Sequence, residues 1–500
     1  MNPSQEVDLL TLIDSIQRMD DLDATWLAVS TLLLQFCDSH NNTPQDWGLP
    51  IGEPQSAIMA TEALFIAEVL ESGGSNPTED SSSAFASADH RMALQRVARE
   101  GLAQYRFATT NFTSLVVARG IAGGIDEMFG HTYIEWFRNE LEVAVTAGNV
   151  HPILAHDPRR WIGEHKPNSN ISSLPSRDLA RSPRLQIAPK SASTIGFVLD
   201  FSFWHRLSML GDSTGLSAAT LQPNLRLHEF DVVKDEGEPP TYTNSGPSDP
   251  RIQAARVLNL IRDAGERDTP VALLPEYSLS QQAAELVESG IEDLERCPVL
   301  VVAGISGEPD GDGRVRNEVW VHIGADFATR GRWARLPGKL YGATIEGYQE
   351  GIAAGTEVRV LCCESFTVAI LTCKDCLDGA LIDQLAAIGV NLLLVPAMTP
   401  KTASMIGSAT RLSQQSQAFV VMAVGPALWV DTENDHVPSR YVPHRAEATF
   451  AGPYADGSPT RCLPDQHLCP GLDEVGSWHF DFSTRSAQWF PEPNTTIDNN

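Results

Sequence analysis

Three residues of this sequence have the type and the surroundings needed for nucleophilic catalysis: Glu276, Lys339 and Cys373. Cys373 ends the apolar run in FTVAILTCKDCLDG, at a predicted strand-to-helix junction, and a helix N-terminus favours the thiolate, the reactive form of cysteine. Glu276 follows the apolar run VALLP, where partial desolvation would suit a carboxylate to general-base catalysis. Lys339, in RGRWARLPGKLYG, could stabilise an oxyanion that forms on a substrate.

Each of the three residues also has a structural interpretation when it is taken alone. A cysteine beside a strand is commonly a small core residue, and most lysines lie at the protein surface. A glutamate that ends a strand is commonly solvated. The order Glu, Lys, Cys, with each residue in its particular context, is therefore more informative than any one member.

The segment that must position these residues alternates between strands and helices from about residue 225 onward. Apolar strands separated by helices predict an α/β fold in which the sheet is covered on at least one face. The predicted strands are Leu225–Val233, Val271–Leu274, Val299–Ile305, Val319–Ile323, Phe366–Thr372, Asn391–Val395 (closed by Pro396), Val420–Val424, Ala446–Ala451 and Trp478–Phe482. The predicted helices are Arg251–Ala264, Gly379–Ile388 and Ser408–Phe419.

The first third of the chain is predicted to be mainly α-helical, because apolar residues recur there at three-to-four spacing. The helical patterns cover the stripe Leu9, Leu12, Ile13 and Ile16, and then Ala57–Leu70, Arg91–Phe107 and Ile134–Ala147. We therefore predict a helical domain of unknown function at 1–155 and an α/β domain at 223–485. A linker or surface strap at 156–222, in which Ile195–Phe203 has the pattern of a strand, joins them, and 486–500 is a polar tail.

Composition restricts the class of protein. The chain has 500 residues, enough for several domains, and its 42% hydrophobic and 20% charged residues are typical of a globular protein. The formal net charge of −28 disfavours binding to nucleic acid or to an anionic membrane surface. No run of about 18 apolar residues and no signal-peptide pattern occurs. Eight cysteines are too few for a disulfide scaffold, so the expected location is cytoplasmic.

Residues from about 225 to 485 resemble the nitrilase, or carbon–nitrogen hydrolase, superfamily. Six segments carry the resemblance, in matching order: VALLPEYSLS, NEVWVHIGADFATRGRWARLPGKLYG, FTVAILTCKD, GVNLLLVPAMTP, ATRLSQQSQAFVVMAV and ATFAGPYADGS. They cover about half the chain. The first third resembles no family that we can name.

The resemblance implies a four-layer α-β-β-α sandwich of the nitrilase type and a Glu–Lys–Cys triad. Cys373 would then attack a carbonyl or nitrile carbon, and Glu276 would take the thiol proton and later deliver it to the leaving amine. Lys339, helped by the backbone N–H of Lys374, would hold the oxyanion. A thioester acyl-enzyme would form, and water would hydrolyse it.

The implied activity is that of an amidase on a small-molecule amide or nitrile, without metal or other cofactor. A nitrilase or a carbamoylase would use the same triad. Association into homo-oligomers is usual in the family. A non-catalytic sensor of amides, with the helical part as its output, is the alternative outside the enzymes.

Four further residues are candidates for binding substrate or the oxyanion. Many family members carry a second glutamate after the lysine, and Glu350 is favoured over Glu346 because Gly355 follows it at a family-like spacing. Tyr277 follows the predicted base. Lys374 stands where the family usually has an aromatic residue, and its cation could lower the pKa of the neighbouring thiol or contact an anionic substrate group.

The sequence leaves other interpretations of the cysteines open. Cys373 and Cys376 form a C-x-x-C pair, which is also found in thioredoxin-like redox sites. A zinc site is a second alternative, with ligands drawn from Cys373, Cys376, Cys462, His467 and Cys469. Both alternatives leave the contexts of Glu276 and Lys339 unexplained. A further departure from the family is Gly425-Pro426, where an asparagine is common.

Overall fold

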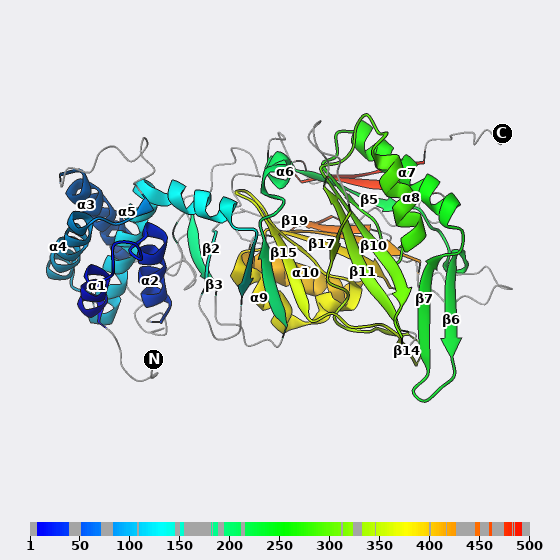
Figure 1. The fold of residues 1–500 in the computed structure, drawn as a ribbon, viewed down its shortest axis with the longest axis horizontal. Helices are drawn as coiled ribbons and strands as arrows, with labels where there is room; N and C mark the ends of the chain where they lie inside the picture. The colour runs from blue at the N-terminus through cyan, green and yellow to red at the C-terminus, as the bar shows by residue number, and fades with distance from the viewer. Residues whose placement is uncertain are drawn as a thin grey trace. The chain divides into compact units, whose positions relative to one another are not determined.

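The structure is a computed structural model of the chain (Figure 1). Its described residues are helices and several sheets of a mixed α/β structure, and among them no helix is long and apolar enough to cross a membrane. The described residues are 8–39, 52–71, 84–107, 110–145, 151–154, 182, 184–188, 195–211, 216–311, 314–323, 333–345, 347–399, 402–416, 418–426, 446–450, 460–462, 475–482, 484 and 486–492.

The chain divides into two compact units. Unit 1 is formed by Met1–Leu141, Gly148–Asp157 and Pro167–Lys190, and unit 2 by Glu142–Ala147, Pro158–Lys166 and Ser191–Asn500. The helices of unit 1 are α1 (Leu9–Gln17), α2 (Trp26–Ser39), α3 (Gly52–Glu71), α4 (Ala88–Gln104) and α5 (Thr110–Asn139), and its strands β2 (His151–Leu154) and β3 (Leu185–Ala188) pair antiparallel.

The helices predicted for the first third are found, with one exception. Leu9, Ile13 and Ile16 are buried on one side of α1, as their spacing predicts. The predicted helix Ile134–Ala147 is wrong in its second half: α5 ends at Asn139, and β1 (Glu142–Val145) follows it. The alternating, valine-containing sequence EVAV suits a strand, and β1 pairs antiparallel with β4 of unit 2.

Three sheets make up the strands of unit 2. The first sheet has the order β1, β4 (Gly196–Asp200), β15 (Glu357–Cys362), β16 (Thr367–Ile370), β17 (Leu392–Met398), β18 (Phe419–Gly425), β19 (Ala446–Phe450), β20 (Thr460–Cys462). The second has the order β12 (Trp333–Leu336), β11 (Val315–Ile323), β10 (Leu300–Pro309), β8 (Val271–Leu273), β5 (Ser217–Gln222), β21 (Gly476–Asp481), β22 (Ser486–Pro491), with β9 (Leu279–Ser280) beside β10. The third has the order β13 (Thr344–Ile345), β14 (Tyr348–Glu350), β7 (Thr241–Pro247), β6 (Phe230–Asp235).

Each of the two large sheets has a parallel centre. β16, β17 and β18 run parallel in the first sheet, and β5, β8 and β10 run parallel in the second. The two sheets face each other, since β5 contacts β18 and β10 contacts β17. Residues that follow β8 and β16 therefore lie at the carboxyl ends of parallel strands in the middle of each sheet. Ligands bind at such strand ends in many α/β folds.

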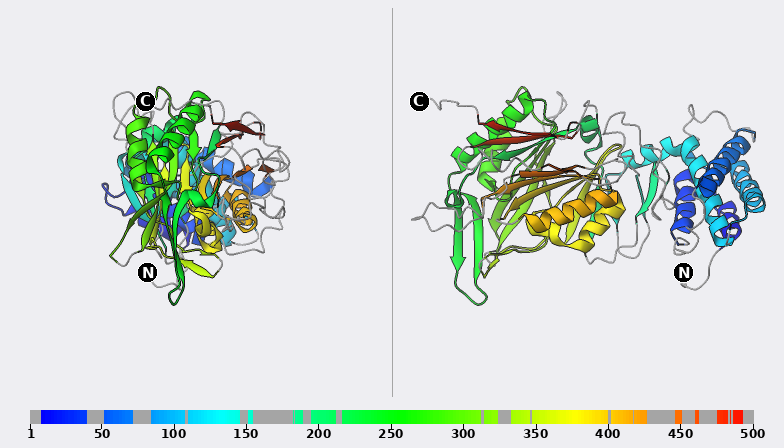
Figure 2. Two further views of the ribbon diagram at one scale, coloured as in Figure 1. Left: turned by 90° about the vertical axis from the view of Figure 1, so that its right-hand side faces the viewer. Right: turned by 180° about the vertical axis from the view of Figure 1, so that it is seen from behind.

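Helices lie on both outer sides of these strands (Figure 2). α7 (Pro250–Glu266) and α8 (Gln281–Ile291) lie on one side, and α9 (Gly379–Ile388) and α10 (Ala403–Ser416) lie on the other. α7 begins where its sequence indicates, because Asp249 caps the backbone N–H groups of Arg251 and Ile252 ahead of a proline in the first turn.

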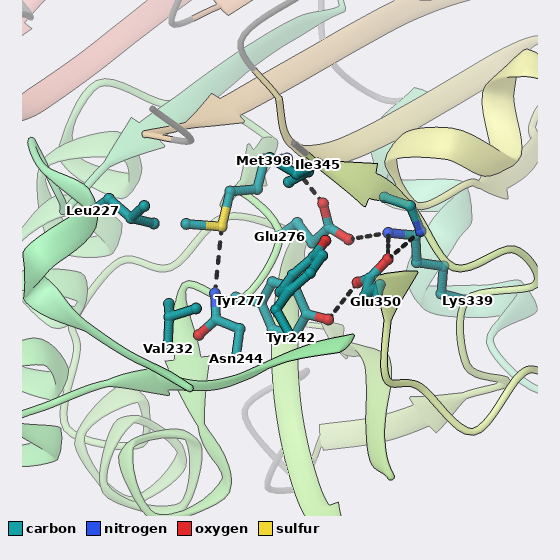
Figure 3. Close-up of a pocket in the computed structure, with 11 residues that line it drawn as sticks. Leu227, Val232, Tyr242, Asn244, Glu276, Tyr277, Lys339, Ile345, Glu350 and Met398 are labelled. Atoms are coloured by element: carbon teal, nitrogen blue, oxygen red, sulfur yellow. Dashed lines mark hydrogen bonds and ion pairs between the residues drawn. The ribbon is translucent and has the colours of Figure 1, made fainter. Parts of the chain in front are cut away.

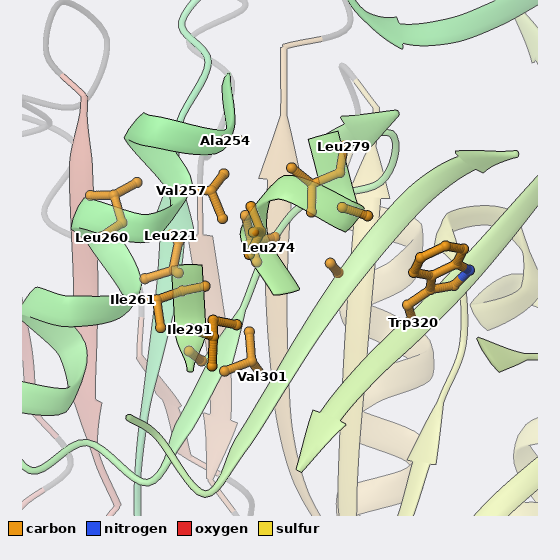
Figure 4. Packing of buried hydrophobic residues seen from close by; sticks show 14 of the residues in the cluster. Leu221, Ala254, Val257, Leu260, Ile261, Leu274, Leu279, Ile291, Val301 and Trp320 are labelled. Carbon is orange, nitrogen blue, oxygen red and sulfur yellow. The ribbon is translucent and has the colours of Figure 1, made fainter. Parts of the chain in front are cut away.

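The apolar face of α7 packs onto the second sheet (Figure 4). Val257, Leu260 and Ile261 of the helix join Leu221 of β5 and Val301 of β10 in one fully buried cluster. Burial of each such side chain stabilises the fold by about 1.5–3 kcal/mol. This apolar face therefore holds α7 against β5 and β10.

Several element limits differ from the prediction, and each difference has a local cause. β6 begins at Phe230 and not at Leu225, because the Glu229 carboxylate accepts the backbone N–H groups of Leu225 and Arg226 and holds a short 3₁₀ turn there. β22 lies within the range predicted as a polar tail. β22 pairs with β21, and the Cζ atom of Arg267, the residue after α7, lies 3.6 Å from the centroid of the Phe490 ring of β22.

Candidate active site

Each of the three predicted catalytic residues follows the end of a strand in unit 2. Glu276 comes just after β8, Lys339 just after β12, and Cys373 just after β16 as the first residue of the 3₁₀ helix η7 (Cys373–Leu377). Met398 is the last residue of the neighbouring strand β17. All four residues are buried.

A buried ion cluster forms the centre of the site (Figure 3). The Nζ atom of Lys339 donates to Oε1 of Glu276 at 2.7 Å and to Oε2 of Glu350 at 2.6 Å. The side chains of all three residues are at most 2% exposed. An ammonium ion at this depth is stable only because two carboxylates compensate its lost hydration.

Neighbouring polar groups complete the hydrogen bonding of the two carboxylates. Asn317 Nδ2 donates to Oε1 of Glu276 at 2.7 Å and to Oε1 of Glu350 at 3.2 Å. Glu350 Oε1 also accepts the hydroxyl of Tyr277 at 2.5 Å, and its Oε2 accepts the backbone N–H of Ala343 at 2.6 Å. These contacts hold both carboxylates in one orientation, as a preorganised site requires.

The backbone around Glu276 is tightly constrained. A Cβ atom on Gly304 of β10 would lie 2.5 Å from the Cα atom of Glu276, so only glycine permits this close approach. Tyr277 and Cys373 both have left-handed backbone conformations, with φ of 59° and 48°. Such strain in residues other than glycine is concentrated at functional sites in proteins.

The two glutamates differ in their acidity. Burial raises the pKa of Glu276 above its ordinary value, which Lys339 only partly opposes and the charge of Glu350 reinforces. Burial also acts to raise the pKa of Glu350, but Lys339 outweighs it, with further help from Tyr277 and Ala343, and this pKa is lowered. Burial acts to lower the pKa of Lys339, yet the two carboxylates raise it well above the ordinary value. Glu350 is thus the permanent counter-ion, and Glu276 is the carboxyl that can exchange a proton.

Met398 links the thiol of Cys373 to Glu276. The backbone N–H of Met398 donates to Oε2 of Glu276 at 2.9 Å, and its carbonyl oxygen accepts from Sγ of Cys373 at 3.9 Å. Burial raises the pKa of Cys373, and the charge of Glu276 raises it further against the opposing effect of Lys339. The expected helix N-terminus is only the short 3₁₀ helix η7, and burial beside the charge of Glu276 disfavours the thiolate.

The segment that follows the nucleophile is fastened to the segment that follows Lys339; we call these contacts the clasp. The Asp375 carboxylate accepts the backbone N–H groups of Leu340 at 3.1 Å and Tyr341 at 3.0 Å. Lys374 Nζ donates to the carbonyl oxygen of Gly342 at 2.7 Å, so its cation is fixed on the backbone of that segment. Burial raises the pKa of Asp375 to about 7.

A small cavity lies beside the ion cluster (Figure 3). Glu276, Lys339 and Glu350 line its polar end. The rest of the lining is largely apolar, and half of it comes from the third sheet: Leu227, Val232, Tyr242, Asn244, Tyr277, Ala343, Ile345 and Met398.

The structure thus connects Glu276, Lys339, Glu350 and Tyr277 by direct hydrogen bonds and links Cys373 to Glu276 through the backbone N–H and C=O of Met398. Glu346 lies outside the described residues. Asn317 and Met398 lie within two of the family-like sequence segments, but no role was predicted for either residue. Asn317 at the start of a strand was the available signal; the role of Met398 comes from backbone atoms, which no side-chain pattern reveals.

The other cysteine hypotheses have partial outcomes. Cys373 and Cys376 are free thiols in the structure. Of the residues weighed for zinc, His467 and Cys469 lie outside the described residues, as does the side chain of Cys462. At the predicted departure, a Cβ atom on Gly425 would lie 3.2 Å from Cβ of Pro275, so the end of β18 packs beside the residue that precedes Glu276.

No protein-family model and no curated protein matches the sequence. Similar solved structures include an amidase from Nesterenkonia sp., with 14% identity, a TM-score of 0.33, and coverage of 56% of this chain and 87% of that chain. The NitN amidase from Nesterenkonia sp. AN1 is 15% identical, with a TM-score of 0.34, over 50% of this chain and 93% of its own. A cysteine-to-serine variant of the AN1 amidase, described as from the nitrilase superfamily, is 12% identical, with a TM-score of 0.34, over 55% and 88%.

Proposed function

We propose that this chain is a hydrolase of non-peptide carbon–nitrogen bonds, and specifically an amidase with Cys373 as its nucleophile. One observation carries the proposal. Glu276, a buried carboxyl group of raised pKa, is hydrogen-bonded to the buried ammonium group of Lys339. The backbone N–H and C=O of Met398 link this carboxyl group to the buried thiol of Cys373. A base, an electrophile and a nucleophile within one desolvated site are the parts that acyl transfer needs.

In the first half-reaction, Glu276 takes the thiol proton as Sγ of Cys373 attacks the amide carbonyl carbon. A C–S bond forms, and negative charge develops on the carbonyl oxygen. Lys339 stabilises this oxyanion, since an ammonium has three N–H donors and two are directed at Glu276 and Glu350. The backbone N–H of Lys374 assists. The C–N bond then breaks, and Glu276 gives its proton to the leaving amine.

In the second half-reaction, water hydrolyses the thioester. Glu276 takes a proton from the water molecule, whose oxygen bonds to the thioester carbon. The C–S bond breaks as the intermediate collapses, and the proton on Glu276 returns to the departing sulfur of Cys373. The products are a carboxylic acid, ammonia from a primary amide, and the regenerated thiol.

The proposal extends to the architecture of the chain. Two facing sheets with helices on both outer sides support a four-layer α-β-β-α sandwich of the nitrilase type for unit 2. We assign the chemistry to this unit and an assembly or regulatory role to the helical domain at 1–155. The expected partner is a small-molecule amide, and no cofactor takes part in any step.

The test is ammonia release from a panel of primary amides and nitriles by the full-length protein. We expect amide turnover by the wild type, none by Cys373→Ser, because an alkoxide forms far less readily than a thiolate, and near-normal turnover by Cys376→Ser. The Cys376 thiol is buried in the same 3₁₀ helix, which makes it a matched control. Turnover of nitriles alone would make the protein a nitrilase.

A second measurement covers the case without turnover. Treatment with iodoacetamide at alkaline pH, where a thiol of raised pKa ionises, followed by peptide mapping is expected to label Cys373. If no substrate is turned over while simple amides raise the melting temperature of the protein, the chain is an amide-binding sensor and the proposed chemistry is wrong.

A further inference from the structure

Asn317 of β11 has a hydrogen bond to each of the three charged residues of the ion cluster. Its Nδ2 atom donates to Glu276 and Glu350, and its backbone carbonyl oxygen accepts the backbone N–H of Lys339 at 2.8 Å. Asn317 is fully buried and lies opposite Ser306 of β10. The pairing of the two strands becomes irregular directly beyond this pair, and such irregularities redirect side chains beside active sites.

The amide group of Asn317 can serve the site in one orientation only. Its two N–H donors serve Glu276 and Glu350, whereas its Oδ1 atom is buried and has no hydrogen-bond partner among the described residues. A buried acceptor without a partner is costly. The opposite orientation would direct Oδ1 at two carboxylates, which repel it. The side chain thus gives up its acceptor in order to supply two donors to the carboxylates.

The two carboxylates depend on this amide to different degrees. Among the described residues, Glu350 accepts three further hydrogen bonds, and Nδ2 of Asn317 lies 3.2 Å from it. Glu276 accepts two further hydrogen bonds, and Nδ2 lies 2.7 Å from it. Burial raises the pKa of Glu276, and the hydrogen bond from Asn317 acts against that rise. Loss of the amide should therefore affect Glu276 more than Glu350.

The backbone of Asn317 helps to fix the segment that carries Lys339. On its other side, the carbonyl oxygen of Lys339 accepts the backbone N–H of Gly355 at 2.8 Å. A Cβ atom on Gly355 would lie 2.1 Å from the carbonyl oxygen of Gly338, so only glycine permits this approach. The main chain at Lys339 is thus held on two sides before its side chain reaches the carboxylates.

We propose that Asn317 is a positioning residue of this site: its amide aligns Glu276 and Glu350 on Lys339, and its backbone carbonyl holds the segment that carries Lys339. This role rests on the amidase function proposed above. Asn317 is not among the residues that line the cavity, so it acts on the reaction through Glu276 and Lys339.

The experiment compares the wild type with Asn317→Leu, which has the same branched shape, lacks both donors and keeps the backbone carbonyl. kcat/KM for primary amides is measured across a pH series. Without the amide, the charged form of Glu276 is less favoured, so the midpoint of the acid limb should rise by about one pH unit or more, the shift that a hydrogen bond to a charged group can produce. kcat at the optimal pH should fall about a hundredfold, the effect of a small displacement of reacting groups.

Two variants separate positioning from packing. Asn391→Leu removes another buried amide, whose hydrogen-bond partners are the backbone groups of Ser365 and Thr367. It should lower the melting temperature and keep the midpoint of the wild type. Asn317→Ser retains one donor, so its midpoint should lie between those of the wild type and Asn317→Leu. If Asn317→Leu does not fold, the rise in Asn317→Ser decides.

Infrared difference spectroscopy measures the protonation of Glu276 without turnover. The band of its protonated carboxyl group, assigned by its loss in Glu276→Gln, is followed across the same pH series, and its midpoint should rise in Asn317→Leu. The other titratable groups that interact with the charge of Glu276 are unchanged in these variants: Lys339, Glu350, Tyr242, Tyr277, Cys373 and Asp375.

Each outcome bears on one of the two proposals. A midpoint in Asn317→Leu equal to that of the wild type, or an equal shift in Asn391→Leu, would overturn the positioning role, while amide turnover by the wild type would uphold the amidase. If the wild type turned over no amide and Cys373 were not acylated, the amidase would be overturned. The infrared midpoint would still decide whether Asn317 controls Glu276.

Discussion

The ionisation of the two buried glutamates decides how the site can work. Glu350 has a lowered pKa and stays charged beside Lys339, whereas burial raises the pKa of Glu276. A base whose pKa is raised toward neutrality can both take the thiol proton and return it to the leaving group. The pKa of the neighbouring Cys373 thiol is raised as well, so the proposed reaction would begin with proton transfer from this thiol to Glu276.

These directions predict two pH profiles. A protonated Glu276 cannot act as the base, so kcat/KM should fall with decreasing pH at a midpoint above the ordinary glutamate value, and be independent of pH above it. Alkylation of Cys373 by iodoacetamide should have its midpoint above that of an ordinary cysteine, since burial and the charge of Glu276 both raise the pKa of this thiol.

Glu276→Gln separates the two profiles. It removes the base and should abolish turnover, yet it also removes a negative charge beside the thiol, so the alkylation midpoint should move to lower pH. Mass spectrometry of the Cys373 peptide across a pH series measures this midpoint. A midpoint that rises, or does not move, would show that Glu276 does not face the thiol.

At the scale of elements, the clasp joins the segment that follows Cys373, the proposed nucleophile, to the segment that follows Lys339, the proposed electrophile. Asp375 accepts two backbone N–H groups that follow Lys339 directly. Asp375→Ala leaves both groups without an acceptor in a buried place, at a cost of about 1–3 kcal/mol for each. Because small displacements of reacting groups slow catalysis about a hundredfold, we expect kcat to fall on that scale.

The control for this variant is Asp383→Ala. Asp383 pairs with Arg411 at the surface, and its side chain is 41% exposed, so its loss should change the free energy of unfolding by at most about 1 kcal/mol. Urea denaturation and kcat from ammonia release measure the two effects. An Asp375→Ala enzyme with normal kcat would mean that the clasp does not position Lys339.

Sequence patterns located the central strands β8, β10, β16, β17 and β18 of the two large sheets, because each is largely an apolar run. They missed β5 and β7, whose sequences SAATLQ and TYTNSGP contain many polar residues. The patterns failed where a contact with a distant part of the chain determines where a strand ends. Pro396 was expected to end a strand, but β17 continues to Met398 and stays paired with β18 over these residues. Pairing with β16 stops at Leu394, so on that side the proline, which has no N–H, follows the last paired residue.

Glu276, Lys339 and Glu350 could each be predicted from the sequence as residues of the site. Their hydrogen bonds to Asn317 and to the backbone N–H of Met398 could not, because these depend on how separate strands are brought together.

At the scale of the whole molecule, each of the two units has its own core. In unit 1, the fully buried Trp26 stacks on Phe129, with ring centroids 4.1 Å apart, and meets Phe65 edge-on. Trp26→Ala should therefore lower the free energy of unfolding of unit 1 by about 3–5 kcal/mol.

Hydrogen exchange resolved by mass spectrometry can assign this loss to one unit. We expect faster exchange in α2, α3 and α5 and unchanged exchange in the strands of unit 2, because multidomain proteins open in separate cooperative units. Trp136→Ala, at a position that is 38% exposed, is the matched control and should have a clearly smaller effect. Equal acceleration in both units would show that they unfold as one.

The two backbone contacts of Met398, to Glu276 and to Cys373, have a consequence for how this protein can change during evolution. The groups that hold the base and the thiol in register at this position belong to the main chain, and every amino acid except proline supplies them. A mutation at position 398 to any residue other than proline therefore leaves in place the two backbone groups that contact Glu276 and Cys373. The amino acid at this position can thus vary among relatives of the chain, with proline, which has no backbone N–H, the one residue that would lose the contact to Glu276.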